Sequence, residues 1–293
     1  MVLPCAIGTS DVVCGCARRL GMKVLVFAGT TEGSTFVCRA LAAGHAVTAS
    51  VATAYGAETL ARHVTSARVG GRADAATPVT LRILHGRLDA DAMTQLVPSF
   101  DVVVDATHPY AVQVTQNVAR ACGACGVPLY RLLRPRSPVP RDAHLREFGS
   151  LDELVQTLCA LPENNRIFLA TGSRDLARFS VIPRYAERLF VRVLPSVEAL
   201  DLCAAAGIPA SHIVAVQGAC SVALNEALFR EYGCAVLVTK ESGTAGGFAE
   251  KLAAAARCGM EVYALTPPEE RHERAFSSVD ALLSALAGRK GEA

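Results

Sequence analysis

The stretch KVLVFAGTTEG, residues 23–33, decides the fold of this chain. Its apolar run predicts a buried parallel strand, and a helix is expected to follow at residues 33–43. A strand, a glycine-containing turn and a helix in this order open a doubly wound α/β domain. Glycines let the backbone approach a pyrophosphate, and a helix N-terminus offers free N–H groups and a favourable dipole. We therefore expect a dinucleotide to bind at Gly29, Thr30, Thr31, Glu32 and Gly33.

The turn lacks the strict G-x-G-x-x-G pattern, so its position at the first strand–helix junction supports the prediction. The alternative is an ordinary turn in which a threonine caps the helix. The end of the next predicted strand, VTASVAT at residues 47–53, contains no acidic residue to hold ribose hydroxyls. Ser50, Thr53 and Arg87 are instead expected to contact a 2′-phosphate. This favours NADPH, with NADH as the alternative.

Strands and helices alternate along the chain, which predicts parallel sheets with helices on both faces. In the first half we expect strands at residues 23–28, 46–51, 65–69, 80–84, 101–105 and 128–131, and helices at 33–43, 89–97 and 110–125. In the second half we expect strands at 166–170, 188–193, 212–216, 234–238 and 260–265, and helices at 150–160, 196–206, 221–231 and 246–257. The predicted fold is therefore α/β, with two Rossmann-like doubly wound parallel-sheet domains and a ligand cleft between them.

Three prolines within residues 134–142 interrupt the alternation and mark the expected domain boundary. We assign the nucleotide-binding domain to residues 22–140 and the substrate-side domain to residues 141–288. Residues 1–21 lack periodicity and are expected to be a disordered extension, with Met22 as the natural start; a short extra strand or cap is the alternative. Residues 289–293 are expected to form a polar tail.

Composition excludes several classes of protein. Of the 293 residues, 51% are hydrophobic and 19% charged, which is typical of a globular enzyme and not of a disordered chain. No apolar run is long enough to span a membrane, and a formal net charge of +2 does not indicate a nucleic-acid or membrane partner. The 11 cysteines show no zinc-site spacing and no secretory signal accompanies them. We expect free thiols, no metal, a reducing cytoplasmic compartment, and a monomer or homodimer.

Four further polar clusters follow predicted strands, at the sheet edge where ligands of parallel sheets bind. They are DATHPY at residues 105–110, TGSR at 171–174, QGACS at 217–221 and TKESGTAGG at 239–247. In the first and third, Thr107 and Ser221 are alternatively helix caps. The fourth cluster contains three glycines and a lysine, and a second lysine follows in the next predicted helix. Such a segment could bind carboxylates or phosphates. The residues expected to bind substrate are Asp105, Thr107, His108, Tyr110, Arg134, Gly172, Ser173, Arg174, Gln217, Ser221, Lys240, Ser242, Gly243 and Lys251.

These strings, taken in order, resemble the precorrin-6A reductase family of cobalamin biosynthesis and its cobalt-precorrin-6A relatives. The matching stretches lie between about residue 23 and residue 268, and they include residues 29–33, 86–88, 105–111, 131–135, 171–174, 217–225 and 239–251. The resemblance implies an oxidoreductase that reduces a double bond of precorrin-6A, or of its cobalt form, to precorrin-6B by hydride transfer from NAD(P)H. It also implies that Arg134, Arg174, Lys240 and Lys251 converge on the carboxylates of that corrin-ring precursor.

Hydride transfer must be matched by a proton, and His108 and Lys240 are the expected donors, with solvent as the alternative. Two other functions are compatible with the sequence. One is an NADPH-dependent reductase of a smaller substrate, which leaves the lysine-containing glycine loop without a purpose. The other is a non-catalytic NADPH-binding redox sensor, which predicts cofactor binding without turnover and an exposed apolar patch.

Overall fold

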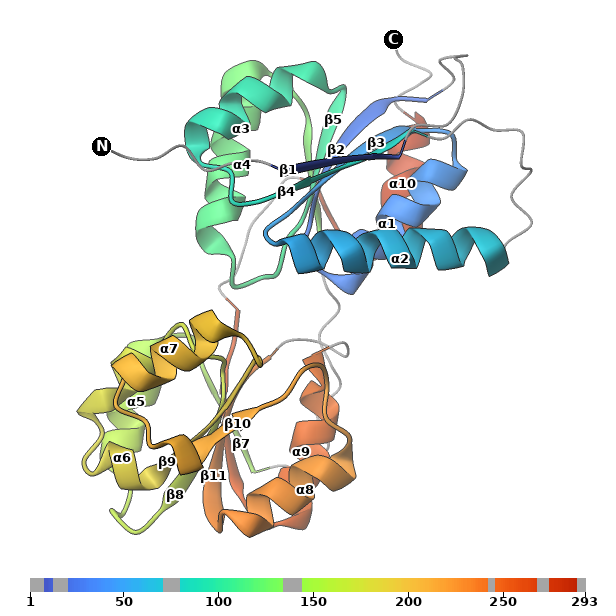
Figure 1. Cartoon of the computed structure of the whole chain (residues 1–293). Helices are drawn as coiled ribbons and strands as arrows, with labels where there is room; N and C mark the ends of the chain where they lie inside the picture. The colour runs from blue at the N-terminus through green and yellow to red at the C-terminus, as the bar shows by residue number, and fades with distance from the viewer. Residues whose placement is uncertain are drawn as a thin grey trace. The chain divides into compact units, whose positions relative to one another are not determined.

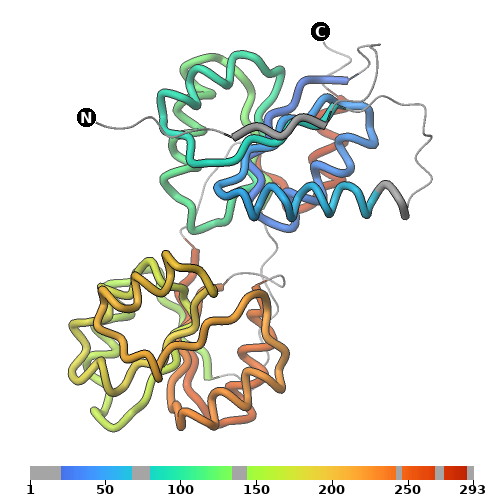
Figure 2. Tube along the Cα trace, in the orientation of Figure 1, coloured from blue at the N-terminus to red at the C-terminus, as the bar shows by residue number. Residues whose placement is uncertain are grey.

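The computed structural model describes residues 8–12, 21–70, 80–133, 144–241, 246–267 and 274–288. The chain divides into two compact units (Figures 1 and 2). The first unit comprises residues 1–134 and 270–293, and the second comprises residues 135–269. The second unit is thus an insertion into the first. It begins within the proline-rich stretch at residues 134–142 and ends at residue 269.

The first unit is built on a seven-stranded sheet with the order β1-β4-β3-β2-β5-β6-β13. Its strands are β1 (Gly8–Val12), β2 (Lys23–Ala28), β3 (Ala46–Val51), β4 (Leu81–His85), β5 (Val102–Ala106), β6 (Leu129–Leu132) and β13 (Ala275–Phe276). All neighbours pair in parallel except β1, which pairs antiparallel with β4. Both immediate neighbours of β2 are parallel and its last five residues are buried, which explains its continuous apolar run.

Helices cover both faces of this sheet. They are α1 (Thr31–Ala42), α2 (Ala54–Gly70), α3 (Ala90–Leu96), η1 (Val97–Ser99), α4 (Val112–Cys125) and α10 (Val279–Gly288). Alternate residues of β2 point to opposite faces: Val24 and Val26 pack with α1, α2 and α10, whereas Leu25 and Phe27 pack with α3 and α4. The strand predicted at residues 65–69 is wrong, because this segment is the end of α2. Ala57, Leu60 and Val64 are buried at helical spacing along that helix.

Two boundary predictions also need correction. Residues 8–12 belong to the predicted disordered extension, yet they form β1 on the edge of the first sheet; the rest of that extension lies outside the described residues. The assignment of the whole stretch 141–288 to the second domain is wrong at its end. β13 pairs with β6, and Leu282 and Leu286 of α10 are completely buried in the core of the first unit. A two-residue strand is too short to show a periodic sequence signal.

The second unit contains a six-stranded parallel sheet with the order β10-β9-β8-β11-β12-β7. Its strands are β7 (Leu145–Phe148), β8 (Arg166–Ala170), β9 (Leu189–Val193), β10 (Ile213–Ala215), β11 (Cys234–Lys240) and β12 (Glu261–Leu265). Its helices are α5 (Leu151–Cys159), η2 (Leu176–Val181), α6 (Tyr185–Arg188), α7 (Val197–Ala205), η3 (Ala210–His212), α8 (Val222–Glu231) and α9 (Phe248–Arg257). Figure 1 shows α5, α6 and α7 on one side of the sheet, with α8 and α9 on the other.

The core of the second unit is rich in aromatic residues on the side of α8 and α9. Phe168 of β8 lies edge-on to Phe229 of α8, and their ring centroids are 5.0 Å apart. Phe248 and Leu252 bring α9 into the same cluster. Both units therefore have independent cores and the predicted α/β architecture. None of the helices in the described ranges combines the length and hydrophobicity needed to cross a bilayer.

Candidate functional site

The first sheet changes direction beside β2. The chain builds β3 and β4 on one side of β2, and then β5 and β6 on the other. Because β2 and β5 are parallel neighbours, their carboxyl ends lie at the same edge, and the segments that follow them separate to opposite faces. This is the position where open parallel sheets bind nucleotides. The turn at residues 29–33 follows β2, and the DATHPY segment begins at the end of β5.

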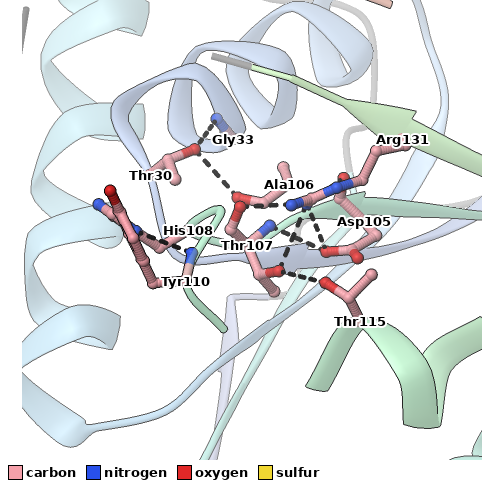
Figure 3. A network of polar contacts seen from close by, with 9 residues as sticks. All are labelled: Thr30, Gly33, Asp105, Ala106, Thr107, His108, Tyr110, Thr115 and Arg131. Atoms are coloured by element: carbon pink, nitrogen blue, oxygen red, sulfur yellow. Dashed lines mark hydrogen bonds and ion pairs between the residues drawn. The ribbon is translucent and has the colours of Figure 1, made fainter. Parts of the chain in front are cut away.

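Thr30 organises the turn after β2 (Figure 3). It is the N-cap of α1, and its hydroxyl oxygen accepts a hydrogen bond from the backbone N–H of Gly33 at 3.1 Å. The same hydroxyl donates to the backbone oxygen of Ala106, at the end of β5, at 3.0 Å. The backbone N–H of Gly29 points to that oxygen too, at 3.4 Å. Thr30 therefore caps α1, and the cap also joins β2 to β5.

The two glycines of the turn have different roles. A Cβ atom on Gly33 would lie 3.0 Å from the Ala106 Cβ and 3.3 Å from the Ala28 Cα, so Gly33 allows α1 to approach β5. A Cβ on Gly29 would lie 3.7 Å from the Thr107 Cα, which is ordinary contact, and Gly29 and Thr31 are exposed. An exposed glycine turn in front of the N-terminus of a 12-residue helix fits a diphosphate group. Glu32 lies half-buried in the first turn of the same helix.

The other residues expected to bind the cofactor follow the neighbouring strands. Ser50 is buried in β3, 8% exposed, next to the end of that strand. Thr53 lies beyond it, and its hydroxyl accepts a hydrogen bond from the backbone N–H of Gly56 at 3.0 Å, so it caps the first turn of α2. Arg87 is exposed, after Gly86, whose positive φ of 121° turns the chain at the end of β4. All three therefore lie at the same edge as the turn.

Asp105 and Arg131 form a buried ion pair below this edge. The Arg131 Nη1 lies 3.0 Å from the Asp105 Oδ1, and the two side chains are 1% and 0% exposed. Asp105 Oδ1 also accepts a hydrogen bond from the backbone N–H of Thr107 at 2.9 Å. The prediction that Asp105 contacts substrate does not fit this complete burial. Asp105 instead supports the backbone of the loop after β5.

The rest of that loop is more accessible. Thr107, His108 and Tyr110 are all half-buried. The rings of His108 and Tyr110 stack with centroids 5.5 Å apart, and the backbone N–H of Tyr110 donates to His108 Nδ1 at 3.4 Å. A neutral His108 that accepts at Nδ1 carries its proton on Nε2. Thr107 does not cap α4, because its N-cap is Ala111; the Thr107 hydroxyl lies 3.3 Å from that of Thr115 instead.

In the second unit, the strand order changes direction between β8 and β11. Lys240 at the end of β11 forms a 2.8 Å ion pair with Asp175, in the turn after β8. The same turn contains Gly172, with φ of 84°, the half-buried Ser173 and the exposed Arg174. The hydroxyl of Thr171 is buried there without a hydrogen-bond partner among the residues described. The carboxyl ends of β8 and β11, both predicted from the sequence to bind ligand, are thus neighbours.

A second cluster of polar residues lies beside α8 and α9. Arg192 of β9 donates from Nη1 to the side-chain oxygen of the fully buried Asn225 at 2.8 Å. Lys251 is only 3% exposed, and burial with the nearby Arg192 charge lowers its pKa to about 7. Burial is also the main cause that lowers the pKa of Arg192. A buried amine beside a half-buried guanidinium favours an anionic partner, which would stabilise the charged form of both groups.

The structure describes only some of the remaining residues that were expected to bind substrate. The Ser221 hydroxyl caps α8 by accepting from the backbone N–H of Leu224 at 3.2 Å, as its alternative assignment predicted. Gln217 is exposed after β10. Arg134, Ser242 and Gly243 lie outside the described residues. Within the described residues, His, Cys, Asp and Glu side chains form no cluster that could hold a metal ion.

Sequence reasoning did not assign roles to Arg131, Arg192 and Asp175. A signal existed for the first two, because each is an arginine within an otherwise apolar strand. A charge at such a position needs a buried partner, which directs attention to Asp105 and Asn225. Asp175 gave no signal, since its partner Lys240 lies on a distant segment that only the fold brings close.

The chain was also compared with known proteins. The model of a family described as "Precorrin-6x reductase CbiJ/CobK" matches residues 23–287. A cobalt-precorrin-6A reductase of Methanothermobacter thermautotrophicus is 32% identical over 91% of this chain and 84% of its own length. A precorrin-6A reductase of Rhodococcus erythropolis is 33% identical over 84% of this chain and 89% of its own. A solved structure of "CobK precorrin-6A reductase" superposes with a TM-score of 0.67 at 25% identity, covering 91% of this chain and 96% of that one.

Proposed function

Because this chain belongs to the precorrin-6x reductase CbiJ/CobK family, we propose that it reduces one double bond of a precorrin-6A macrocycle, giving precorrin-6B, with NADPH as the hydride donor. The reaction would belong to cobalamin biosynthesis. Relatives named for the cobalt form and for the metal-free form are 32% and 33% identical to this chain, so the proposal includes both macrocycles. The eight cysteines in the described part of the chain are free thiols, which supports a reducing, cytoplasmic setting for this reaction.

The turn at residues 29–33 is the observation on which the proposal rests. Its exposed glycine, the N-terminus of α1 and its position where the sheet changes direction are the features that a nucleotide diphosphate requires. Ser50, Thr53 and Arg87 lie at the same edge and would hold the 2′-phosphate of NADPH; NADH is the weaker alternative. The bound cofactor supplies the hydride, and the chain's own residues bind and orient it.

Basic residues of the second unit support a polycarboxylate substrate. Arg174 is exposed in the turn after β8 and Lys240 lies at the end of β11, while Lys251 of α9 is buried beside the half-buried Arg192 of β9. Carboxylate arms would neutralise the charges of Arg174 and Lys240, whereas Lys251, which is 3% exposed, would pair with a carboxylate only after its surroundings open.

The proton that accompanies the hydride needs a donor. His108 remains one proposal, because a histidine ring can donate a proton from its charged form and this ring is half-buried in the loop after β5. Lys240 is the second, and its ammonium group lies 2.8 Å from the Asp175 carboxylate in the turn after β8. Replacing each residue by glutamine separates them, because the donor's loss would lower kcat while leaving the KM for NADPH nearly unchanged.

The test is turnover by the purified full-length chain. Incubation with NADPH and precorrin-6A, and separately with its cobalt form, is expected to consume the absorbance of the reduced nicotinamide and to give a product two hydrogens heavier by mass spectrometry. Activity on a small carbonyl compound, with neither macrocycle reduced, would support a different reductase. Nucleotide binding without oxidation in any arm would support the redox sensor. Absence of binding to both NADPH and NADH would overturn the proposal.

A further inference from the structure

The loop after β5 is fixed from below by one buried guanidinium group. Arg131 Nη1 donates to the backbone oxygens of Asp105 at 3.2 Å and Thr107 at 3.1 Å, in addition to its ion pair with the Asp105 carboxylate. The Asp105 carboxylate accepts from the backbone N–H of Thr107. The backbone on both sides of Ala106 is therefore held by the same two side chains (Figure 3).

Ala106 transmits this constraint to the turn after β2. Its backbone oxygen accepts from the Thr30 hydroxyl and from the Gly29 N–H, at 3.0 Å and 3.4 Å. Its Cβ lies where a side chain on Gly33 would clash. A shift of residues 105–107 would therefore change both the orientation of the Thr30 cap and the distance between α1 and β5.

From these contacts we propose that Arg131, together with Asp105, is a positioning residue for the nucleotide: it sets the geometry of the turn at residues 29–33 without touching the cofactor. The inference rests on the proposed binding of NADPH to the first unit. Both side chains are at most 1% exposed, so neither is available as a direct ligand in this arrangement. A fixed binding geometry lowers the ordering cost that a ligand meets on binding.

Arginine is required at this position because of its shape. Nη1, which makes all of these contacts, is held in the plane of a rigid guanidinium, whereas an ammonium group is a compact charge on a flexible stem. Arg131→Lys would keep the charge beside Asp105 and lose part of the bonding to the backbone. Asp105→Asn would keep the acceptor for the Thr107 N–H and remove the charge.

The chain offers a matched control in the second unit. Arg188 is also an almost completely buried arginine, 2% exposed. It donates to three backbone oxygens, those of Asn165, Pro183 and Pro162, at 3.0, 3.0 and 3.1 Å. Arg188→Lys therefore disturbs a comparable buried guanidinium far from the turn in the sequence. It should lower thermal stability without acting on the nucleotide.

The experiment is calorimetric titration of the full-length variants with NADPH, at a temperature where circular dichroism shows each to be folded. Arg131→Lys is expected to raise the Kd for NADPH by about tenfold, the equivalent of one or two net hydrogen bonds. Asp105→Asn should raise it by about threefold, because it retains one of the contacts. Arg188→Lys should leave the Kd within about twofold of the unsubstituted chain. In turnover, the KM for NADPH should rise for the first two variants while the KM for the macrocycle is unchanged.

An unchanged Kd in Arg131→Lys or, if that variant does not fold, in Asp105→Asn would overturn the inference. An equal rise in Arg188→Lys would overturn it too, because the effect would then be general destabilisation. The unsubstituted chain separates this outcome from failure of the proposed function: if it does not bind NADPH, the assignment of the cofactor itself has failed.

Discussion

Lys251 makes the stability of the second unit depend on pH. Its pKa falls from 10.5 to about 7 on folding, so the unfolded chain binds more protons between these pH values. The free energy of unfolding should therefore rise with pH in this window relative to Lys251→Met, which has no titrating amine. The gain should be on the order of a few kcal/mol from pH 7 to pH 10. Urea unfolding of both proteins across that range measures it; parallel curves would contradict the prediction.

The same lysine should take up a proton when the macrocycle binds. At pH 8 an amine with a pKa of about 7 is mostly neutral, and a carboxylate placed beside it raises that pKa. Titration with the macrocycle in buffers of different ionisation enthalpy should show uptake approaching one proton. Lys251→Met should bind with less uptake. Equal uptake by both proteins would mean that the carboxylates bind elsewhere.

The two glycines of the turn should respond in opposite ways to substitution. Gly33→Ala places a Cβ 3.0 Å from that of Ala106, so we expect a lower melting temperature, with a loss of about 1 to 3 kcal/mol from overpacking. Gly29→Leu fills the exposed side of the turn, so we expect an unchanged melting temperature and at least about a tenfold weaker binding of NADPH. Thermal scans and calorimetry on both variants distinguish the packing glycine from the ligand-facing one. The reverse pattern would exchange their roles.

At the scale of elements, the cap of α1 is the contact most open to a clean test. Thr30→Ala removes both the acceptor for the Gly33 N–H and the donor to Ala106, and should cost about 1 to 2 kcal/mol. Thr30→Ser keeps a hydroxyl and should retain most of this stability. Denaturant unfolding gives the difference between the variants. A serine variant as unstable as the alanine variant would show that the methyl group, and not the hydroxyl, matters.

The elements could be predicted from the sequence where one signal dominates. β2 is apolar from Val24 to Ala28 because both sides of it are covered there, and Thr30 lies where a cap is expected. The prediction failed for α2, whose buried residues Ala57, Leu60 and Val64 are separated by small and polar residues. The buried contacts of Arg131 and Lys240 could not be predicted, because their partners come from strands whose order the sequence does not state. The unknown pairing of distant segments therefore limited the prediction of the site more than errors in local structure did.

For the whole molecule, the insertion of the second unit suggests a simple dissection. Leu133 and Phe276 are joined by a backbone hydrogen bond of 2.8 Å, so the chain leaves and re-enters the first unit through adjacent strands. A short glycine-serine linker replacing residues 134–273 should leave a folded first unit. We expect it to bind NADPH within about threefold of the full-length Kd and to lack reductase activity. A linked fragment that folds without binding NADPH would show that the second unit contributes to the nucleotide site.

The return of the chain to its first sheet also dictates an order of events at the ribosome. The unit that begins first cannot bury Leu282 and Leu286 until the final helix has been made. The inserted unit, whose strands are contiguous in sequence, is complete earlier and can fold while its host still waits for its last strand and helix. A released fragment that ends near residue 270 would then contain every strand of the inserted unit but would lack β13 and α10 of the first unit.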